Sequence, residues 1–421
     1  MRGFLRSRRA IGVFIAVIAI HVLLGIATFG PSTSMDLTDV PVAVLDADGG
    51  QLGAELTGAE VEQIEWQTVG SRQALDEALD DKEVAAGLII PEGATEALGD
   101  LAGEQPQPVV LELLSNRGRN PEAAQAVEQI IDGIAAGAAA EVSSETLAGV
   151  AEAGIDITPE AVHVLAEPIR VDIVAVNAPA DAGDAQTPLV LVAMLWIGSL
   201  IATLVSWLSL HRKDITPTGF LGGQLVIVAV LSIVQPLSIV AVGNWLLGLD
   251  ISLSWALFGA LALTTALFFL LQSAVLNWLG FGGWPILVLL WLFSFTLLAV
   301  PVEALATGYR VLVHSWLPSR FPYEGIQGIV HFDGAGQAGL MMAISGAIAI
   351  GALLVLLASY VRLKDRDLGI NPLQERIANT GNPDDADTDD TETDDSDASP
   401  GPQQPDPGAG RGRDSAPAGT F

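Results

Sequence analysis

Cysteine is absent from the 421-residue chain, and lysine occurs only three times, at Lys82, Lys213 and Lys364. Without cysteine the chain has no disulfide framework, no thiol nucleophile and no thiolate metal site. A phosphate loop of the form G-x-x-x-x-G-K-[ST] needs a lysine directly after a glycine-rich turn. None of the three lysines stands in that context, so the sequence excludes a phosphate-loop ATPase within this chain.

Other catalytic signatures are missing as well. Neither H-E-x-x-H, which positions a zinc ion, nor G-x-S-x-G, which positions a nucleophilic serine, occurs in the sequence. The five histidines are scattered, at His21, His163, His211, His314 and His331. We therefore expect no enzymatic activity, no metal and no cofactor in this chain.

Charge is scarce and mostly negative. Charged residues make up 16% of the chain, whereas a soluble domain has about 25%. Hydrophobic residues make up 50%, and the mean hydropathy is +0.47. The net charge of −30 argues against nucleic-acid binding, which needs Lys and Arg to neutralise phosphates. The composition instead indicates that lipid replaces water around much of the surface.

Six apolar stretches are long enough to cross a bilayer, which takes about 20 helical residues. They are residues 10–30, Leu189–Leu210, Leu221–Leu247, Leu253–Leu279, Trp284–Leu305 and Ala338–Tyr360. Their interiors hold no charged residue, whereas ion-driven carriers usually place ionisable groups there. The polar residues inside are more typical of hydrogen bonds between helices. These residues are Gln224, Gln235, Asn244, Gln272 and Asn277.

The first stretch has two interpretations, a cleaved signal peptide or an uncleaved anchor. The apolar region of a signal peptide is usually about 7–15 residues long, and this stretch is longer. No clean small-x-small cleavage site follows it. We interpret it as an anchor.

Between the first and second stretches, apolar runs shorten and alternate with helical patterns. Ser71 and Asn120-Pro121 are typical helix starts. Strands are expected at Val40–Leu45, Ile64–Val69, Ala86–Ile90 and Val109–Leu114, with one or two more in Leu165–Val176. Strands alternating with helices predict an α/β domain with a mostly parallel sheet.

Basic residues fix the expected orientation, because short cytoplasmic loops are enriched in Lys and Arg. With six spans, the N-terminal arginines, Arg212 with Lys213, and Arg362 with Lys364 all fall on one side. That side is then the cytoplasm of a bacterial plasma membrane, and the α/β domain lies outside. The sequence thus predicts an α-helical polytopic membrane protein with an extracytoplasmic α/β domain inserted between the first and second spans.

The expected organisation has five parts. The acidic C-terminal part cannot bury enough apolar area to offset chain entropy, so it is predicted to be disordered. The parts are a cytoplasmic N-terminus (1–9), the first transmembrane helix (10–30), the α/β domain (31–186), a five-helix transmembrane domain (187–365) with an outer segment at 306–337, and a disordered acidic cytoplasmic tail (366–421).

Two segments carry candidate functional residues. Arg212, Lys213 and Asp214 form a basic loop where an ATPase could push on the helices, although a simple connector is an equal alternative. In 306–337, apolar residues near helical spacing predict two short amphipathic helices at the outer interface, the first broken at Pro318 and the second following Pro322. These could cover a lateral path for lipids or form a packed surface loop. The candidates there are Tyr309, Arg310, Trp316, Pro318, Arg320 and Tyr323.

The order of these motifs resembles the ABC-2 type transporter permeases, and within them the YhgE/Pip-like membrane proteins. Residues 37–50, LTDVPVAVLDADGG, are similar to the family's l-P-V-A-V-V-N-x-D-x-G stretch just outside its first span. Trp66–Val69 before a short helix, Ala86–Pro91 and Ser115-Asn116 resemble its next elements, and five clustered spans close the chain.

The resemblance implies a permease half of an exporter in the plasma membrane. Two copies, as a homodimer or heterodimer, would pair among membrane lipids and recruit a separate ATP-binding subunit. The cargo in such systems is a lipid, glycan, peptide or drug. Because YhgE/Pip-like members are also linked to phage adsorption and specialised protein secretion, the alternative is a receptor or secretion-accessory protein whose outer domain binds a partner.

Overall fold

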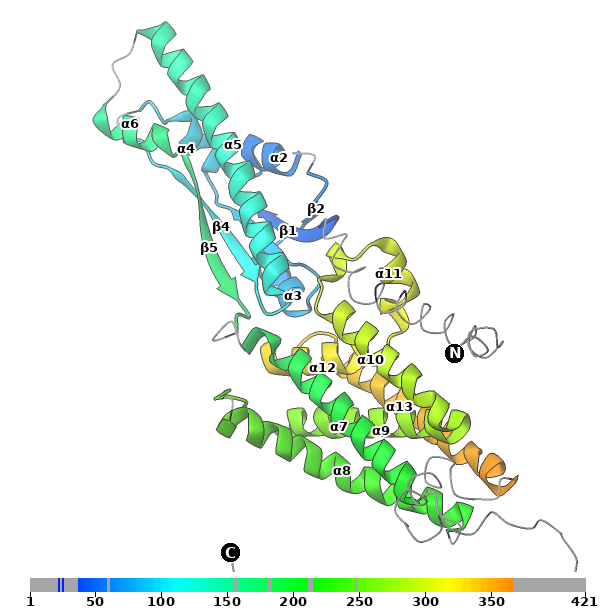
Figure 1. The fold of residues 1–421 in the computed structure, drawn as a ribbon. Helices are drawn as coiled ribbons and strands as arrows, with labels where there is room; N and C mark the ends of the chain where they lie inside the picture. The colour runs from blue at the N-terminus through cyan, green and yellow to red at the C-terminus, as the bar shows by residue number, and fades with distance from the viewer. Residues whose placement is uncertain are drawn as a thin grey trace, which may run out of the picture. The chain divides into compact units, whose positions relative to one another are not determined.

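The computed structural model describes residues 22, 25, 37–58, 61–103, 105–154, 158–179, 184–210, 215–246 and 248–365. Within this part, an N-terminal α/β unit is followed by a mostly helical unit (Figure 1). The expected first span, apart from Val22 and Gly25, and the acidic tail lie outside the described residues.

Five strands form one sheet with the order β2-β1-β3-β4-β5. The strands are β1 (Val40–Asp46), β2 (Ile64–Thr68), β3 (Ala86–Ile90), β4 (Val109–Asn116) and β5 (Ile169–Val176). Strand β1 pairs in parallel with β2 and β3, and β4 pairs in parallel with β5. The prediction of a mostly parallel sheet is confirmed, but β3 and β4 are antiparallel. The first residues of the last predicted strand belong instead to a helix that ends at Ala166.

Helices cover both faces of the sheet because successive side chains of the central strands point to opposite faces, and both sets are apolar. Helices α2 (Gln51–Gly58), α4 (Ala94–Gly99) and α5 (Pro121–Ala153) pack on one face, which includes Val42 and Leu88. Helix α3 (Arg72–Asp80) packs on the other face, which includes Ala43 and Leu114. The remaining helix is α6 (Pro159–Ala166).

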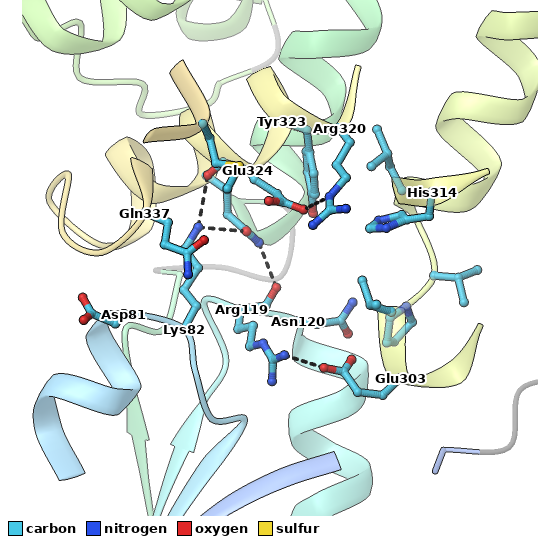
Figure 2. Close-up of a pocket in the computed structure, with 16 residues that line it drawn as sticks. Asp81, Lys82, Arg119, Asn120, Glu303, His314, Arg320, Tyr323, Glu324 and Gln337 are labelled. Carbon is cyan, nitrogen blue, oxygen red and sulfur yellow. Dashed lines mark hydrogen bonds and ion pairs between the residues drawn. The ribbon is translucent and has the colours of Figure 1, made fainter. Parts of the chain in front are cut away.

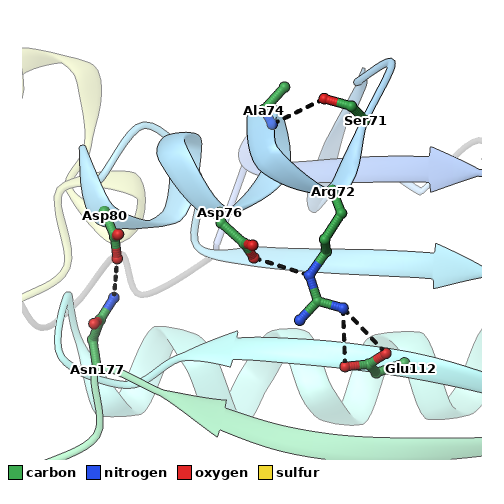
Figure 3. A network of polar contacts seen from close by, with 7 residues as sticks. All are labelled: Ser71, Arg72, Ala74, Asp76, Asp80, Glu112 and Asn177. Atoms are coloured by element: carbon green, nitrogen blue, oxygen red, sulfur yellow. Dashed lines mark hydrogen bonds and ion pairs between the residues drawn. The ribbon is translucent and has the colours of Figure 1, made fainter.

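Capping groups fix where these helices begin, as expected from the sequence. The Ser71 hydroxyl accepts the Ala74 N–H of α3 at 3.1 Å. The Asn120 side chain accepts two N–H groups of α5, each at 3.0 Å. Figure 3 shows how Arg72 ties α3 to the sheet, pairing with Asp76 and reaching Glu112 of β4.

Long apolar helices dominate the second unit. They are α7 (Thr187–Leu210), α8 (Pro217–Leu246), α9 (Trp255–Leu279), α10 (Gly283–Leu298) and α13 (Ala338–Asp365). Four stretches among the described residues are long and apolar enough to cross a membrane: Asp184–Leu210, Pro217–Leu246, Trp255–Leu298 and Ala338–Val361. Helix α8 continues through Pro236, which the sequence suggested as a bend.

The third stretch doubles back on itself at η3 (Gly280–Gly282), the predicted tight turn. The first helix, α9, begins beside the short helix α12 (Arg320–His331), where Leu257 packs with Ile329. The second helix, α10, ends beside α12 as well, because Leu298 lines a cavity together with Gln327. The returning helix α10 ends at Leu298 rather than at the predicted Leu305, because Pro301 lacks the N–H that a longer helix needs.

The segment before α13 contains two short α-helices, as predicted. These are α11 (Thr307–Leu312) and α12, with 3₁₀ turns η4 (Val302–Ala304) and η5 (His314–Trp316) beside them. The expected break at Pro322 is wrong, because this proline lies in the first turn of α12, where its missing N–H would have no partner within the helix. Helix α12 packs against α7, α9 and α13.

Polar side chains link the long helices, which confirms their expected role. Gln224 of α8 and Asn277 of α9 exchange amide hydrogen bonds at 3.0 and 3.4 Å. Asn277 also donates to Ser359 of α13 at 3.2 Å. Asn244 is different: both of its amide atoms bond the main chain of Ile251, closing the turn between α8 and α9.

Candidate functional site

One cavity, called the junction cavity, lies at the junction where the α/β unit meets α10 and α12 (Figure 2). Its volume is about 260 Å³. The α/β unit contributes the turns around Lys82 and Arg119, and the helical unit contributes Glu303, Arg320 and Gln327. Residues that are distant in sequence therefore form one site.

Lys82 occupies an unusual backbone position at the end of α3. The Lys82 N–H donates to Leu79, and the Glu83 N–H donates to Ala78 at 2.9 Å, which is a Schellman ending. The residue at this position takes a left-handed conformation, and glycine is usual there. Lys82 has φ = 61°, so the chain carries a lysine where the backbone favours glycine.

A buried asparagine holds this turn in place. The Asn116 side chain, 1% exposed, donates to the carbonyl of Leu79 at 2.7 Å and more weakly to that of Val84. It thereby satisfies carbonyls on both sides of Lys82. The turn is consequently anchored to strand β4, and the lysine side chain points into the cavity (Figure 2).

The Lys82 ammonium is bound by neutral oxygens. It donates to the Glu324 carbonyl at 3.1 Å and to Gln327 Oε1 at 3.2 Å, and it lies 4.8 Å from the centre of the Phe332 ring. The pKa of Lys82 is lowered to about 8, mainly by burial; the Glu324 carboxylate opposes this change and the positive charge of Arg119 adds to it. Strain and burial of a charge are typical of functional positions.

Gln327 joins the two units from the other side. Its side chain is 7% exposed, and its amide donates to the carbonyls of Gly118 at 3.1 Å and Arg119 at 2.8 Å. The Arg119 side chain in turn pairs with Glu303, which follows α10. The turn before α5 is thus attached to the helical unit by two hydrogen bonds from Gln327 and by one ion pair.

The remaining wall comes from α12 and η5. Arg320 Nε pairs with Glu324 at 2.5 Å, one helical turn away. Burial raises the pKa of the Tyr323 phenol to about 12, and burial lowers the pKa of His314 to about 4, with Arg320 adding to the effect. His314 and Tyr323 are therefore neutral at pH 7, and the charges of the cavity are three cations and three carboxylates, Asp81 included.

Of the six candidates in the outer segment, the structure brings two to this cavity. Arg320 and Tyr323 line it, whereas Tyr309, Arg310, Trp316 and Pro318 do not. Trp316 is 56% exposed beside Leu312, which is 70% exposed, and Tyr309 packs near Ala304 and Leu305. The basic loop Arg212–Lys213–Asp214 lies outside the described residues.

Sequence reasoning missed Lys82, Arg119 and Gln327 as site residues. One signal was available, since Lys82 is an isolated lysine between Asp81 and Glu83 at a helix end. Among the described residues, no three acidic or histidine side chains lie close enough to hold a metal ion.

These features define a class of protein, a multi-pass membrane protein that carries an α/β unit before its apolar helices. The sequence profile of the ABC-2 family transporter proteins matches residues 10–360. The chain therefore belongs to that family. Comparison with the curated proteins and with the solved structures gives no match.

Membership of this family has two direct consequences. The chain has a permease-type role, and proteins of this type act with an ATP-binding subunit. The four apolar stretches agree with that role, because they place the chain in the membrane.

Proposed function

We propose that the chain is the permease subunit of an ABC-2 type exporter and works as a dimer with a separate ATPase. The cargo is a lipid, glycan, peptide or drug that leaves across the plasma membrane. The observation that carries the proposal is the family match over residues 10–360. It is supported by the uncharged interiors of the apolar helices, which suit a pump whose energy comes from a partner rather than from an ion gradient.

The proposed topology has six spans with both termini in the cytoplasm and the α/β domain outside. Its support is that α9 and α10 double back at η3, which would give five crossings after β5. Thr187 at the start of α7 and Met341 near the start of α13 lie beside α12 and the α/β unit. The basic residue Arg212 follows the far end of α7 in the sequence, and Lys364 lies in the last turn of α13. The positive-inside rule then assigns the α/β unit to the outside.

The ATPase-coupling loop is testable in the reconstituted complex. Replacing Arg212 and Lys213 by glutamate should reduce transport-stimulated ATP hydrolysis, because the loop would repel the surface that it engages. The matched control is Lys364→Glu, which reverses a charge at the end of a different span. Unchanged stimulation in the double variant would remove the loop from the mechanism.

The alternative function is a receptor or secretion-accessory protein of the YhgE/Pip-like kind. One observation favours it: edge strand β5 leaves Ile173 and Val174 40% and 39% exposed, a surface on which a partner could dock. Purification from native membranes followed by mass spectrometry separates the two proposals. An ATPase recovered with the chain supports the exporter, and its absence with an extracellular protein present supports the receptor.

A further inference from the structure

Three cations from three separate segments face the junction cavity. Lys82 comes from the turn after α3, Arg119 from the turn before α5, and Arg320 from the first turn of α12 (Figure 2). Part of the cavity lining is apolar. It is formed by Leu298, Val300, Pro301, Val302 and Met341.

These cations retain hydrogen-bond donors that their protein partners do not use. A lysine ammonium has three donors, and the described contacts of Lys82 use two of them, on neutral oxygens. A guanidinium has five donors. Arg119 pairs with Glu303 through Nη2 and Arg320 pairs with Glu324 through Nε, so most donors of both side chains are available to a further acceptor within the described contacts.

We propose that this cavity binds an anionic group, a phosphate or a carboxylate, held by Lys82, Arg119 and Arg320. Arginine and lysine together are the usual ligands of such groups, because guanidinium geometry matches their oxygens. A water molecule takes about 30 Å³, so about 260 Å³ accommodates an anionic headgroup with some water. The apolar wall then faces the carbon skeleton that carries the anion.

An anion fits the charges better than a cation does. The carboxylates of Glu303 and Glu324 already have arginine partners, and the third carboxylate, Asp81, is exposed to solvent, whereas the partly buried Lys82 has no carboxylate partner among the described residues. A cation would add a like charge beside a buried ammonium, and an anion would compensate it. The anion could belong to a lipid headgroup or to a small solute, and both offer the same oxygens.

The bound anion would also strengthen the junction. It would bridge two turns of the α/β unit and α12, which packs against α7, α9 and α13. Anion binding would not require export, because the chain itself holds the ligand.

Lysine modification offers a direct test, because the chain has only three lysines. The full-length protein in nanodiscs is treated with acetic anhydride, and mass spectrometry gives the acetylation rate of each lysine. One arm adds inorganic phosphate to nanodiscs of zwitterionic lipid at constant ionic strength. The other arm uses nanodiscs containing phosphatidylglycerol in a phosphate-free buffer. Exposed Lys364 is the internal reference.

The rate at Lys82 should fall about tenfold when the ligand is at ten times its dissociation constant, while the rate at Lys364 stays constant. Protection by phosphate identifies a soluble anion, and protection only by phosphatidylglycerol identifies a lipid headgroup. An unchanged rate at Lys82 in both arms would overturn the proposal.

Substitution of the two arginines tests whether the anion binds in this cavity. The double variant Arg119→Gln/Arg320→Gln should lose the protection of Lys82. The matched control is Arg72→Gln, which removes an arginine of the same domain that pairs with Asp76 and Glu112 outside the cavity. Protection that survives in the double variant would contradict the assignment. If that variant does not fold, the comparison of Lys82 with Lys364 in the unaltered chain decides alone.

Discussion

At the scale of single residues, Lys82 has both destabilising and stabilising effects where the α/β unit meets α12. Its backbone takes a conformation that costs a non-glycine residue about 1–2 kcal/mol. Its ammonium is buried without a carboxylate partner among the described residues. Both costs are offset by contacts across to Glu324, Gln327 and Phe332. The side chain thus stabilises the contact between the two units at the expense of its own turn.

Two substitutions separate these effects. Lys82→Gly removes the backbone cost and the side chain, whereas Lys82→Met removes the charge and keeps the backbone cost. The free energy of opening the turn should be about 1 kcal/mol higher in Lys82→Gly than in Lys82→Met. Amide exchange should then be slower by a factor of about five in Lys82→Gly. Hydrogen exchange of residues 78–84, followed by mass spectrometry on the full chain, measures this. Equal exchange in the two variants would show that the turn is not strained.

The burial of His314 makes the free energy of unfolding depend on pH. Burial lowers its pKa from 6.5 to about 4, so the unfolded chain binds a proton in this interval that the folded chain does not bind. The free energy of unfolding should therefore fall as the pH decreases from 6.5 towards 4. The charged and titratable groups that line the same cavity are Asp81, Lys82, Arg119, Arg320, Glu303 and Glu324, with the Tyr323 phenol.

The variant His314→Gln should lose part of this dependence. Thermal unfolding in detergent at pH 7 and pH 5 provides the comparison, and the drop in midpoint should be smaller in the variant. Lys82 does not interfere, since its lowered pKa acts between about 8 and 10.5, above the pH values compared, although stability rises with pH there as well. Equal drops in both proteins would assign the acid sensitivity to other groups.

At the scale of elements, α12 is the link between the α/β unit and the apolar helices. Gln327 carries much of that link, because its buried amide meets two main-chain carbonyls and Lys82. Removing the amide leaves these groups buried without partners, which costs about 1–3 kcal/mol.

Gln327→Leu should therefore loosen the junction. Spin labels on cysteines introduced at Gln73 in α3 and Leu340 in α13 report the distance between the units, and its distribution should broaden. Gln337→Leu is the matched control, because this exposed glutamine lines the same cavity without a described side-chain hydrogen bond. A distribution that is unchanged by Gln327→Leu would show that the junction is held elsewhere.

The helices and strands were largely predictable because each is determined by a pattern within its own stretch of sequence. Strands β1 to β4 begin at the expected residues because buried strands are short apolar runs between turn residues. The five apolar helices follow from hydropathy in the same way. Helices α2, α4 and α6 were missed, since each is at most eight residues long. The antiparallel pairing of β3 and β4 was missed too, because strand direction depends on the connection and not on strand composition.

The junction was not predictable by such arguments. Lys82 and Gln327 are separated by 245 residues, and no periodic pattern connects them. In the sequence Arg320 stood out with the aromatic residues of its segment, but its neighbours in space come from two other parts of the chain. Candidates chosen by local pattern therefore gave one wall of the cavity and left out the other.

At the scale of the whole molecule, the central claim is that lipid surrounds the long helices. Ile201 of α7, Val230 of α8 and Leu354 of α13 are 57%, 55% and 61% exposed on the protein surface. In water these apolar groups would face solvent at a cost of about 25 cal/mol per Å². In a bilayer the same groups would be covered.

Because the chain has no native cysteine, single cysteines at Ile201, Val230 and Leu354 test this claim most directly, with exposed Ala140 of α5 as the aqueous control. A water-soluble maleimide is applied to intact membranes. The account predicts rapid labelling at position 140 and almost none at 201, 230 and 354. Labelling of those three positions at the rate of position 140 would contradict it.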